Sequence, residues 1–532
     1  MDRVIGIDLG TSNSCVAVVE GDNAIVIPDS EGKRTQPSIV SFFPDGRRVV
    51  GHQAKEQMVY NPQNTVYSAK RMIGRPFSSS EVQTFRELAP YNIIEGPNSS
   101  VLVELFGENY SMTDIAALVL MKMKKIAEDY LGESVSKAVI TVPANFNDGQ
   151  RNATKLAGEA AGLDVLKVIN EPTAAALAYG FGQSFDQRIA VYDFGGGTFD
   201  VTILQISDDI FEVVSTAGDT FLGGDDIDNL IVKMIVNSYW KNYNVDLRSD
   251  PVALLRVRYE AEKAKRRLSS EDQALIQIPS LITTEEGVVD LNVSLTRDNF
   301  NNIVQDTIQK SFVICDEAMK VARTHVSEVE SVVLVGGTTH IPLLRNMVEE
   351  YFGRKPFWGV NPDEVVALGA AIQGSILAGA TSAGSATKDA VLLDVTSLSL
   401  NVATIGGRVE RIIERNTPIP VEKTRLFTTS RDYQKEVRIR IYQGESDKER
   451  DNDLIGMLEL TELDERALRG EAQIEVTFEI DTNGIVQVSA RDALTGHETS
   501  AEIDLYGINH GSSMTAEQLA EGSDDSNAPD VM

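Results

Sequence analysis

The residues best suited to chemistry are three consecutive glycines set between two aspartates. Residues 188–203 read RIAVYDFGGGTFDVTI, with Asp193 before the glycines and Thr198 and Asp200 after them. Because glycines carry no Cβ, their backbone N–H groups can converge on an anion such as phosphate. Carboxylates beside phosphate oxygens need a cation between them, so we expect Mg²⁺ held largely through water. A plain glycine turn in a hairpin is the alternative for a single copy.

A second copy of this pattern lies at the start of the chain. Residues 4–19 read VIGIDLGTSNSCVAVV, which is an apolar strand, Asp8, a polar turn and a returning strand. The stretch has no GxxxxGK[ST] and no helix pattern follows it, which argues against a P-loop or a dinucleotide fingerprint. Two such hairpins, about 185 residues apart, predict two related lobes that face each other across a nucleotide.

A charged segment is a further candidate for ligand binding. Residues 259–270 read YEAEKAKRRLSS and favour a helix. Its polar residues at i, i+3, i+4 and i+7 share one face and are Glu262, Lys265, Arg266 and Ser269. The face is either a solvated ion-pair surface or an adenine clamp, in which a guanidinium stacks on the base and Glu262 accepts from a ribose hydroxyl. This segment alone does not decide between the two.

The elements that must position these residues alternate between strands and helices. Helical periodicity marks residues 113–130, 148–162 and 173–179, and buried strands are expected at 138–143 and up to 170. This alternation favours an α/β architecture. Residues 331–341 predict a strand that runs into Gly336 and Gly337 at a helix N-terminus. Residues 361–380 predict a capped, nearly all-apolar helix with Asp363 near its start.

The character of the chain changes after residue 380. A small, polar stretch typical of linkers leads into the apolar run 390–394, which we expect to dock on another surface. From about residue 395 to 505 the hydrophobic period is two, and Asn483-Gly484 is a hairpin signal. This predicts a compact antiparallel β domain. Beyond residue 508 we expect one short helix start and an acidic, disordered tail.

Composition excludes several classes of protein. The chain has 532 residues, of which 42% are hydrophobic and 24% charged, as in ordinary globular proteins. Cys15 and Cys315 have no paired spacing, so we expect a reducing cytoplasm rather than a disulfide framework. Neither a signal-peptide pattern nor an apolar run of about 18 residues occurs. The formal net charge of −30 argues against nucleic acid and anionic membranes as partners.

Taken together, the motifs resemble those of the seventy-kilodalton heat-shock chaperones, in particular the bacterial DnaK type. The matching stretches are IGIDLGTSNSCVAV, YSAKRMIGR, AVITVPANFNDGQR, NEPTAAALAYG, YDFGGGTFDVT, LVGGTTHIP, NPDEVVALGAA and VLLDVTSLSL. The resemblance implies a two-lobed, actin-like α/β ATPase domain followed by an antiparallel β-sandwich. The implied boundaries are 1–383 for the nucleotide-binding domain, 384–394 for the linker, 395–508 for the peptide-binding sandwich and 509–532 for the tail.

The resemblance also implies the roles of individual residues. The implied catalytic residues are Lys70, Glu171, Asp193, Thr198 and Asp200. The implied nucleotide contacts are Asp8, Gly10, Thr11, Ser12, Asn13, Gly195, Gly196, Gly197, Thr198, Glu262, Lys265, Arg266, Ser269, Gly336, Gly337, Thr338 and Asp363. Asp8, Asp193 and Asp200 are the implied Mg²⁺ residues, acting largely through water, and K⁺ is a candidate second cation. The implied peptide contacts are Val402, Thr404, Ile405, Phe427, Thr428, Ser430, Val437, Ile439 and Ile474. The implied coupling residues are Pro143, Arg151, Lys167, Val391, Leu392, Leu393 and Asp394.

The implied function is that of an ATP-dependent chaperone that binds extended apolar peptides, with ATP binding and hydrolysis controlling peptide affinity. Implied partners are unfolded peptides, a J-domain co-chaperone and a nucleotide exchange factor. The chain ends where the helical lid of the family would begin, which predicts fast peptide exchange. Departures near Asn401 leave open an ATP-binding regulatory or scaffold protein with a narrow client. A filament-forming or sugar-phosphorylating relative is a further alternative, but neither would need the linker and β domain.

Overall fold

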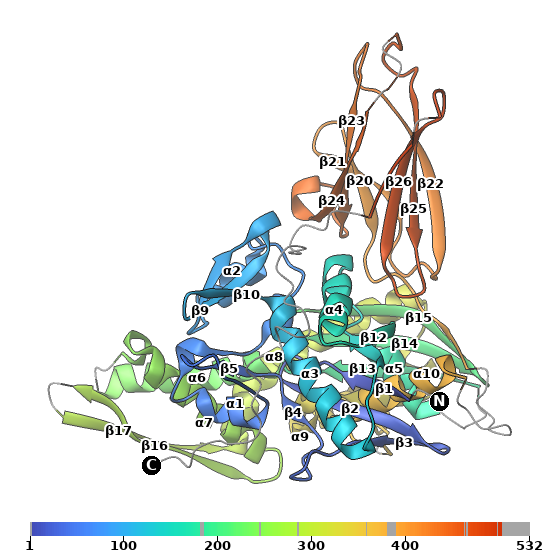
Figure 1. Ribbon diagram of the computed structural model, residues 1–532. Helices are drawn as coiled ribbons and strands as arrows, with labels where there is room; N and C mark the ends of the chain where they lie inside the picture. The colour runs from blue at the N-terminus through green and yellow to red at the C-terminus, as the bar shows by residue number, and fades with distance from the viewer. Residues whose placement is uncertain are drawn as a thin grey trace.

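The computed structural model describes residues 3–180, 186–243, 246–284, 287–357, 359–379, 390–461, 463, 466–496 and 498–502. Residues 3–379 of this part combine helices and sheets and are called the α/β region, and residues 395–502 consist mainly of strands and are called the β region (Figure 1). The expected domain limit at 383, the linker residues 384–389 and the tail 509–532 lie outside the described residues. None of the helices described is both long and apolar enough to cross a membrane.

The first large sheet is built around the hairpin at the start of the chain. Its strands, in spatial order, are β12 (Asp164–Asn170), β11 (Lys137–Val142), β1 (Val4–Asp8), β2 (Asn13–Glu20) and β3 (Asn23–Val26), and β4 (Gln36–Pro37) also pairs with β2. β11 runs parallel to β1 and β12, whereas β2 is antiparallel to β1 and β3.

The second large sheet repeats this arrangement around the glycine-rich hairpin. Its strands, in spatial order, are β18 (Ser331–Val335), β13 (Asp186–Phe194), β14 (Phe199–Ser207), β15 (Ile210–Asp219) and β19 (Val391–Leu393). β18 is parallel to β13, and β13, β14 and β15 are successively antiparallel. The order β11-β1-β2-β3 is therefore matched by β18-β13-β14-β15. This match confirms that the two hairpins predicted from the sequence occupy equivalent places in two sheets.

Two apolar helices pack between the sheets at very short distances. α10 (Val365–Leu377) lies on β1 and β2, and α5 (Glu171–Gly180) contacts both α10 and β13. A Cβ at Gly6 would lie 2.0 Å from the backbone N of Ala371, and one at Gly369 would lie 1.8 Å from the carbonyl oxygen of Ala174. Only glycine allows these backbones to approach so closely.

The structure corrects the expected start of α10. The helix was expected from residue 361 but begins at Val365, and its N-cap residue Glu364 makes no side-chain capping bond. Residues 361–364 form a turn instead, because the Asn361 side chain accepts from the Asp363 N–H at 3.1 Å. Asp363 consequently lies outside the helix and lines the large cleft described below.

Other helices cover the remaining faces of the two sheets. α3 (Met112–Leu131) and α4 (Asp148–Ala160) contact the first sheet, and both begin with a capping box. α8 (Arg297–Ala322) packs on β14 and β15, with α9 (Pro342–Phe352) beside it. These bounds agree with the predicted helices at 113–130 and 148–162.

Further helices and three smaller sheets of the described α/β region lie beyond the two large sheets. Those beside the first sheet are β5 (Val40–Phe42), β6 (Arg48–Val50), α1 (His52–Gln57), β7 (Thr65–Val66), α2 (Ser80–Arg86), β8 (Asn92–Glu95), β9 (Val101–Leu105) and β10 (Glu108–Ser111). Those beside the second are α6 (Gly224–Tyr243), α7 (Pro251–Arg267), β16 (Gln273–Thr284) and β17 (Gly287–Thr296). The helix predicted at 259–270 thus forms the end of α7, which stops at Arg267, so Ser269 lies two residues beyond the helix.

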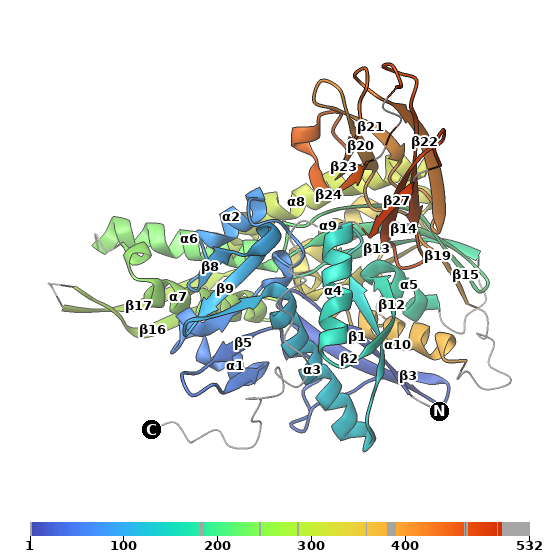
Figure 2. The same cartoon turned by 45° about the horizontal axis from the view of Figure 1, so that its top comes forward.

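The β region contains two four-stranded antiparallel sheets. One has the order β21 (Arg408–Ile413), β20 (Leu400–Thr404), β23 (Val437–Gln443), β24 (Asp453–Leu460). The other has the order β22 (Val421–Thr428), β25 (Gln473–Ile480), β26 (Val486–Asp492), β27 (Glu498–Glu502). Buried residues of both sheets belong to one hydrophobic cluster, which also includes residues of the first large sheet and its helices, and the packing of the two sheets against each other fits a β-sandwich. Figures 1 and 2 show this region above α4 and β15.

Candidate functional site

The two glycine-containing turns meet at one place. Each turn connects the central strands of its sheet, so that Asp8 ends β1 and Asp193 lies near the end of β13. A Cβ on Gly196 would lie 2.0 Å from Ser12 Oγ, and one on Gly197 would lie 2.7 Å from Thr11 Cγ2. Glycine is therefore required where the turn of the second sheet touches the turn of the first.

A cleft of about 730 Å³ opens beside these turns. It is lined by most of the predicted nucleotide residues, namely Asp8, Gly10, Thr11, Ser12, Asn13, Lys70, Glu171, Asp193, Gly195, Gly196, Thr198, Glu262, Lys265, Arg266, Ser269, Gly336, Gly337, Thr338 and Asp363. Asp200 and Gly197 do not line it, although Asp200 pairs directly with Asp193 across the hairpin. A cleft of this size accommodates a drug-sized ligand.

A buried ion pair forms one wall of the cleft. Lys70 belongs to a short 3-10 helix, and its Nζ lies 2.6 Å from Oε1 of Glu171, the first residue of α5. The ammonium group also lies 5.5 Å from the centre of the Phe146 ring. Because both charged groups are buried, neither can be removed without leaving the other uncompensated.

Three further carboxylates lie near this pair, those of Asp8, Asp193 and Asp200, and none of them forms an ion pair of its own within the part of the chain that the structure describes. Burial and, to a smaller extent, the nearby Glu171 carboxylate raise the pKa of Asp8 and of Asp200 to about 7. Burial and the same neighbour raise the pKa of Asp193. Lys70 opposes these shifts but is a single charge. Such a carboxylate group fits a bound cation, since a cation would relieve the repulsion.

The donor set also indicates how a cation would be held. Among the described residues, no three His, Cys, Asp or Glu side chains are close enough to ligate a metal directly. The described carboxylates of the cleft lie near one another without forming a group of three direct ligands, which suits a hydrated cation. Mg²⁺ usually keeps several waters, so the arrangement fits Mg²⁺ bound through water.

The charged end of α7 contributes the opposite wall. Glu262 accepts from Lys55 Nζ at 2.7 and 2.8 Å, which joins α1 to α7 across the cleft. Lys265 donates to Asp228 at 2.8 Å and to the Gly224 carbonyl at 2.9 Å. Arg266 is the exposed member, with 69% of its side chain accessible. The helix face therefore carries ion pairs and also lines the cleft, and its role as an adenine clamp stays a prediction.

The apolar run after the linker docks on the α/β region. Val391, Leu392 and Leu393 form β19, which extends the second sheet parallel to β15. Asp394 Oδ2 then accepts from Asn170 Nδ2 at 2.8 Å and from Thr173 Oγ1 at 3.3 Å. The prediction that this run has a docking surface is confirmed.

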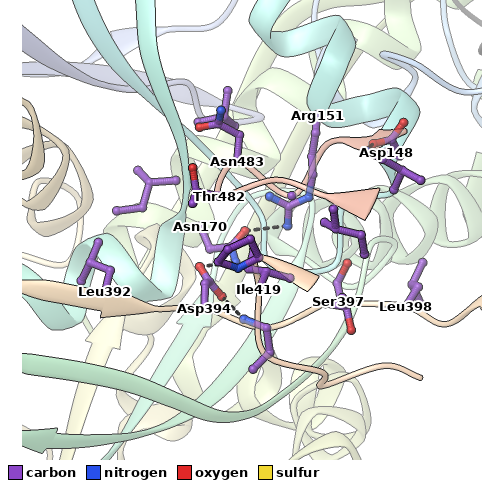
Figure 3. Close-up of a pocket in the computed structure, with 18 of the residues that line it drawn as sticks. Asp148, Arg151, Asn170, Leu392, Asp394, Ser397, Leu398, Ile419, Thr482 and Asn483 are labelled. Atoms are coloured by element: carbon purple, nitrogen blue, oxygen red, sulfur yellow. Dashed lines mark hydrogen bonds between the residues drawn. The ribbon is translucent and has the colours of Figure 1, made fainter. Parts of the chain in front are cut away.

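Arg151 completes this junction (Figure 3). Its guanidinium donates to Asn170 Oδ1 at 2.6 Å and to the carbonyl oxygens of Ala144 and Phe146, on the loop that Pro143 begins. A cavity of about 110 Å³ lies here and is also lined by Lys167, whose pKa burial lowers. Five of the predicted coupling residues line this cavity, namely Arg151, Lys167, Leu392, Leu393 and Asp394, whereas Pro143 and Val391 do not.

The β region contacts the start of α4 directly. Asp148 Oδ1 accepts from the Val486 N–H at 2.7 Å, and the Asp148 N–H donates to Gln443 Oε1 at 3.1 Å. Burial raises the pKa of Asp148 to about 7. Farther along, Arg415 lies 2.6 Å from Glu317 of α8. The two regions are therefore joined by polar contacts as well as by β19.

The comparison with protein families gives the same assignment. Residues 4–531 match the family model described as Hsp70 protein. The chain belongs to the Hsp70 family. Hsp70 proteins are chaperones and ATPases that bind ATP or ADP with Mg²⁺, and they work with unfolded peptides, J-domain proteins and nucleotide exchange factors.

The predicted peptide residues of this Hsp70 protein fall into two groups. Val402, Ile439 and Ile474 are buried, with Ile474 at 0% exposure, and they belong to the hydrophobic core in this arrangement. The half-buried or exposed residues are Thr404, Ile405, Phe427, Thr428, Ser430 and Val437. Ile405, at 76% exposure, is the most accessible large apolar side chain among them. Their role in binding peptide stays a prediction.

Sequence reasoning did not find every residue of the Hsp70 cleft. Lys55 is one, since nothing in HQAKEQ indicates that it reaches Glu262 on α7. His340 is another, because its Nε2 lies 3.0 Å from Asp363 Oδ2 and its Nδ1 accepts from Arg345 at 3.0 Å. The motif LVGGTTHIP contains His340, so its position beside Gly337 was the available signal.

Proposed function

We propose that this Hsp70 protein is an ATP-dependent chaperone that binds extended apolar segments in its β region under control of ATP binding and hydrolysis. One observation carries the proposal. Glu171, which pairs with Lys70 in the cleft, directly follows Asn170, which holds Asp394 after the docked run. A nucleotide-dependent movement of Glu171 would therefore act on the adjacent residue Asn170 and on its hydrogen bond to Asp394, which anchors the β region.

In this proposal residues 1–383 form a two-lobed, actin-like nucleotide-binding domain, with one large sheet and one glycine-containing turn in each lobe. Residues 384–394 form the linker and 395–508 the peptide-binding sandwich. The contact of the two turns and the matching strand orders support two lobes that close on one nucleotide.

In the proposed hydrolysis, a water oxygen bonds to the γ-phosphorus and the bond from that phosphorus to the bridging oxygen breaks. Lys70 stabilises the charge that develops on the equatorial oxygens, while Glu171 and Asp200 orient the water. A pKa of about 7 also suits Asp200 to accept the proton that the water loses. Bound Mg²⁺, held through water by Asp8, Asp193 and Asp200, would neutralise phosphate charge.

Adenosine is proposed to lie along the end of α7. Arg266 offers an exposed guanidinium for stacking on the base, and Glu262 and Lys265 lie on the same wall. Gly336, Gly337 and Asp363 line the cleft as well. The ion pairs from Lys55 and Lys265 hold this wall in place, so they support the adenosine site rather than compete with it.

For the peptide, we propose that an extended segment bonds its backbone to strand edges and places one apolar side chain near Val437. Val437 begins β23 and is half-buried, and Phe427 is half-buried at the end of the edge strand β22. Ile405 adds exposed apolar surface nearby in the chain, just after β20.

Peptide stimulation of ATP turnover tests the proposal, because it requires both regions and the junction together. An extended apolar peptide should raise the steady-state rate several-fold, whereas a charged peptide of equal length should not. Asp394→Ala removes the acceptor for Asn170 and should abolish the stimulation, and Asp447→Ala, at an exposed aspartate, is the matched control. The regulatory or scaffold alternative would be supported if apolar peptides did not change ATP turnover and if no peptide on an apolar peptide array were bound.

A further inference from the structure

A short hydrogen bond ties Asp200 to the loop between β11 and α4. Asn145 Nδ2 donates to Asp200 Oδ1 at 2.6 Å. Asp200 is almost fully buried and pairs with Asp193 across the hairpin, so the two side chains share one face of the sheet. Since Asp200 does not line the cleft, the orientation of its carboxylate decides whether an oxygen atom is presented to the nucleotide.

The loop that carries Asn145 is held from both sides. Arg151 donates to the carbonyl oxygens of Ala144 at 3.2 Å and of Phe146 at 3.3 Å, the residues immediately before and after Asn145. Asn147 then caps α4 through a reciprocal bond with Gln150. The backbone at Asn145 is therefore fixed, and this rigid loop holds the side-chain amide in place beside Asp200.

The neighbouring strand β15 has a glycine where the hydrogen bond between Asn145 and Asp200 passes. Gly218 on β15 pairs with Asp200. A Cβ at Gly218 would lie 2.0 Å from Asn145 Nδ2 and 2.3 Å from Asp200 Oδ1. Any other residue at 218 would displace the Asn145 amide or the Asp200 carboxylate, so this hydrogen bond requires glycine at position 218.

We propose that Asn145 is a positioning residue for ATP hydrolysis, which holds the Asp200 carboxylate in the one orientation that leaves its second oxygen available to the attacking water. The inference rests on the proposed function. The outermost torsion of an aspartate is soft, so without the Asn145 amide the carboxylate keeps the bond from the Asn145 backbone N–H but samples more orientations. Fixing one oxygen removes that freedom before the nucleotide binds.

Single-turnover hydrolysis of bound ATP measures this role. Asn145→Ala should lower the rate constant about tenfold to a hundredfold, while the dissociation constant of a fluorescent ATP analogue stays within about twofold. Asn145→Asp keeps the size but replaces the donor with a second carboxylate, so its rate should fall further. Asn92→Ala is the matched control, since it removes an Asn–carboxylate hydrogen bond of the same length, 2.6 Å to Glu104, from the surface. Its rate should equal that of the unmodified protein.

A double-variant comparison separates this inference from the function it rests on. In an Asp200→Asn background, Asn145→Ala should cause no further loss, because the amide no longer has a carboxylate to orient. The positioning role is overturned by an unchanged rate in Asn145→Ala, by an equal loss of ATP affinity, or by a further loss in the double variant. An unchanged rate in Asp200→Asn alone would instead overturn the proposed use of Asp200 in hydrolysis.

Discussion

Buried charge distinguishes the residues of the cleft from the rest of the acidic surface. Lys70, Glu171, Asp193 and Asp200 are all nearly inaccessible, and burial raises the pKa of each of the two aspartates. Buried charges are rare unless they are paired, because removal from water disfavours the charged form. A concentration of them beside two glycine-containing turns is a functional arrangement rather than a stabilising one.

At the residue scale, Lys70→Ala should nearly abolish ATP hydrolysis while ATP still binds. The lost ammonium group would have stabilised developing phosphate charge, a loss of about a hundredfold or more. Glu171 would also remain buried without its partner, which should lower the free energy of unfolding by about 3 kcal/mol. Single-turnover hydrolysis and thermal unfolding measure the two effects. The control Lys125→Ala breaks an exposed ion pair with Asp129 and should change neither the hydrolysis rate nor the unfolding temperature. Unchanged turnover in Lys70→Ala would show that Lys70 is not part of the catalytic site.

At the element scale, α4 joins the α/β region to the β region through its first residue. Asp148 bonds to Val486 and Gln443, and its other carboxylate oxygen has no partner. Burial raises the pKa of Asp148 to about 7 and outweighs the hydrogen bond from the Val486 N–H and the Arg151 charge, which lower it, while Asp481 raises it. The docked arrangement therefore favours the protonated form of Asp148.

The docking of the β region on α4 should accordingly strengthen as the pH falls. A pKa that is higher when docked contributes stability below that pKa and loses it as the pH rises through about 7. Between about pH 8 and about pH 6 the docking equilibrium should change by about tenfold. Fluorescence energy transfer between the regions measures it, with Asp148→Asn as the comparison. If the variant retains the full pH dependence, another group causes it.

At the scale of the whole molecule, the docked run at 391–393 is the proposed route of communication between the two regions. Leu392 is half-buried against the core formed around α5 and β13, and its strand is the outermost one of the second sheet. β19 contributes just three residue pairs to β15, so this edge is easily displaced. Short pairing of this kind suits a contact that must open and close.

Leu392→Asp should release the β region from the α/β region. Burying an unpaired carboxylate at this edge costs several kcal/mol, which exceeds what three residue pairs can offset. Peptide stimulation of ATP turnover should disappear, and the radius of gyration from small-angle scattering should increase. Leu377→Asp places the same charge at an exposed leucine at the end of α10 and should leave both unchanged. Stimulation that survives in Leu392→Asp would show that docking of β19 is not the route of communication.

The sequence by itself determined the two hairpins and their aspartates, because strand periodicity and glycine-rich turns are local properties. Together with the family resemblance, it named just under half of the residues that line the cleft. It also determined the change to antiparallel strands after residue 395 and the need for the apolar run to dock. It placed the start of α10 too early, since the Asn361 turn competes with a helical cap over the same residues.

Only the tertiary structure decided which residues meet across large separations. Lys55 reaches Glu262, Asn145 reaches Asp200 and Asp148 reaches Val486, and none of these pairs leaves a periodic signal. It also placed Ile474 in the core, although its alternation with polar neighbours would equally suit a peptide contact. A pattern along one strand gives the face on which a side chain lies. What covers that face depends on elements hundreds of residues away.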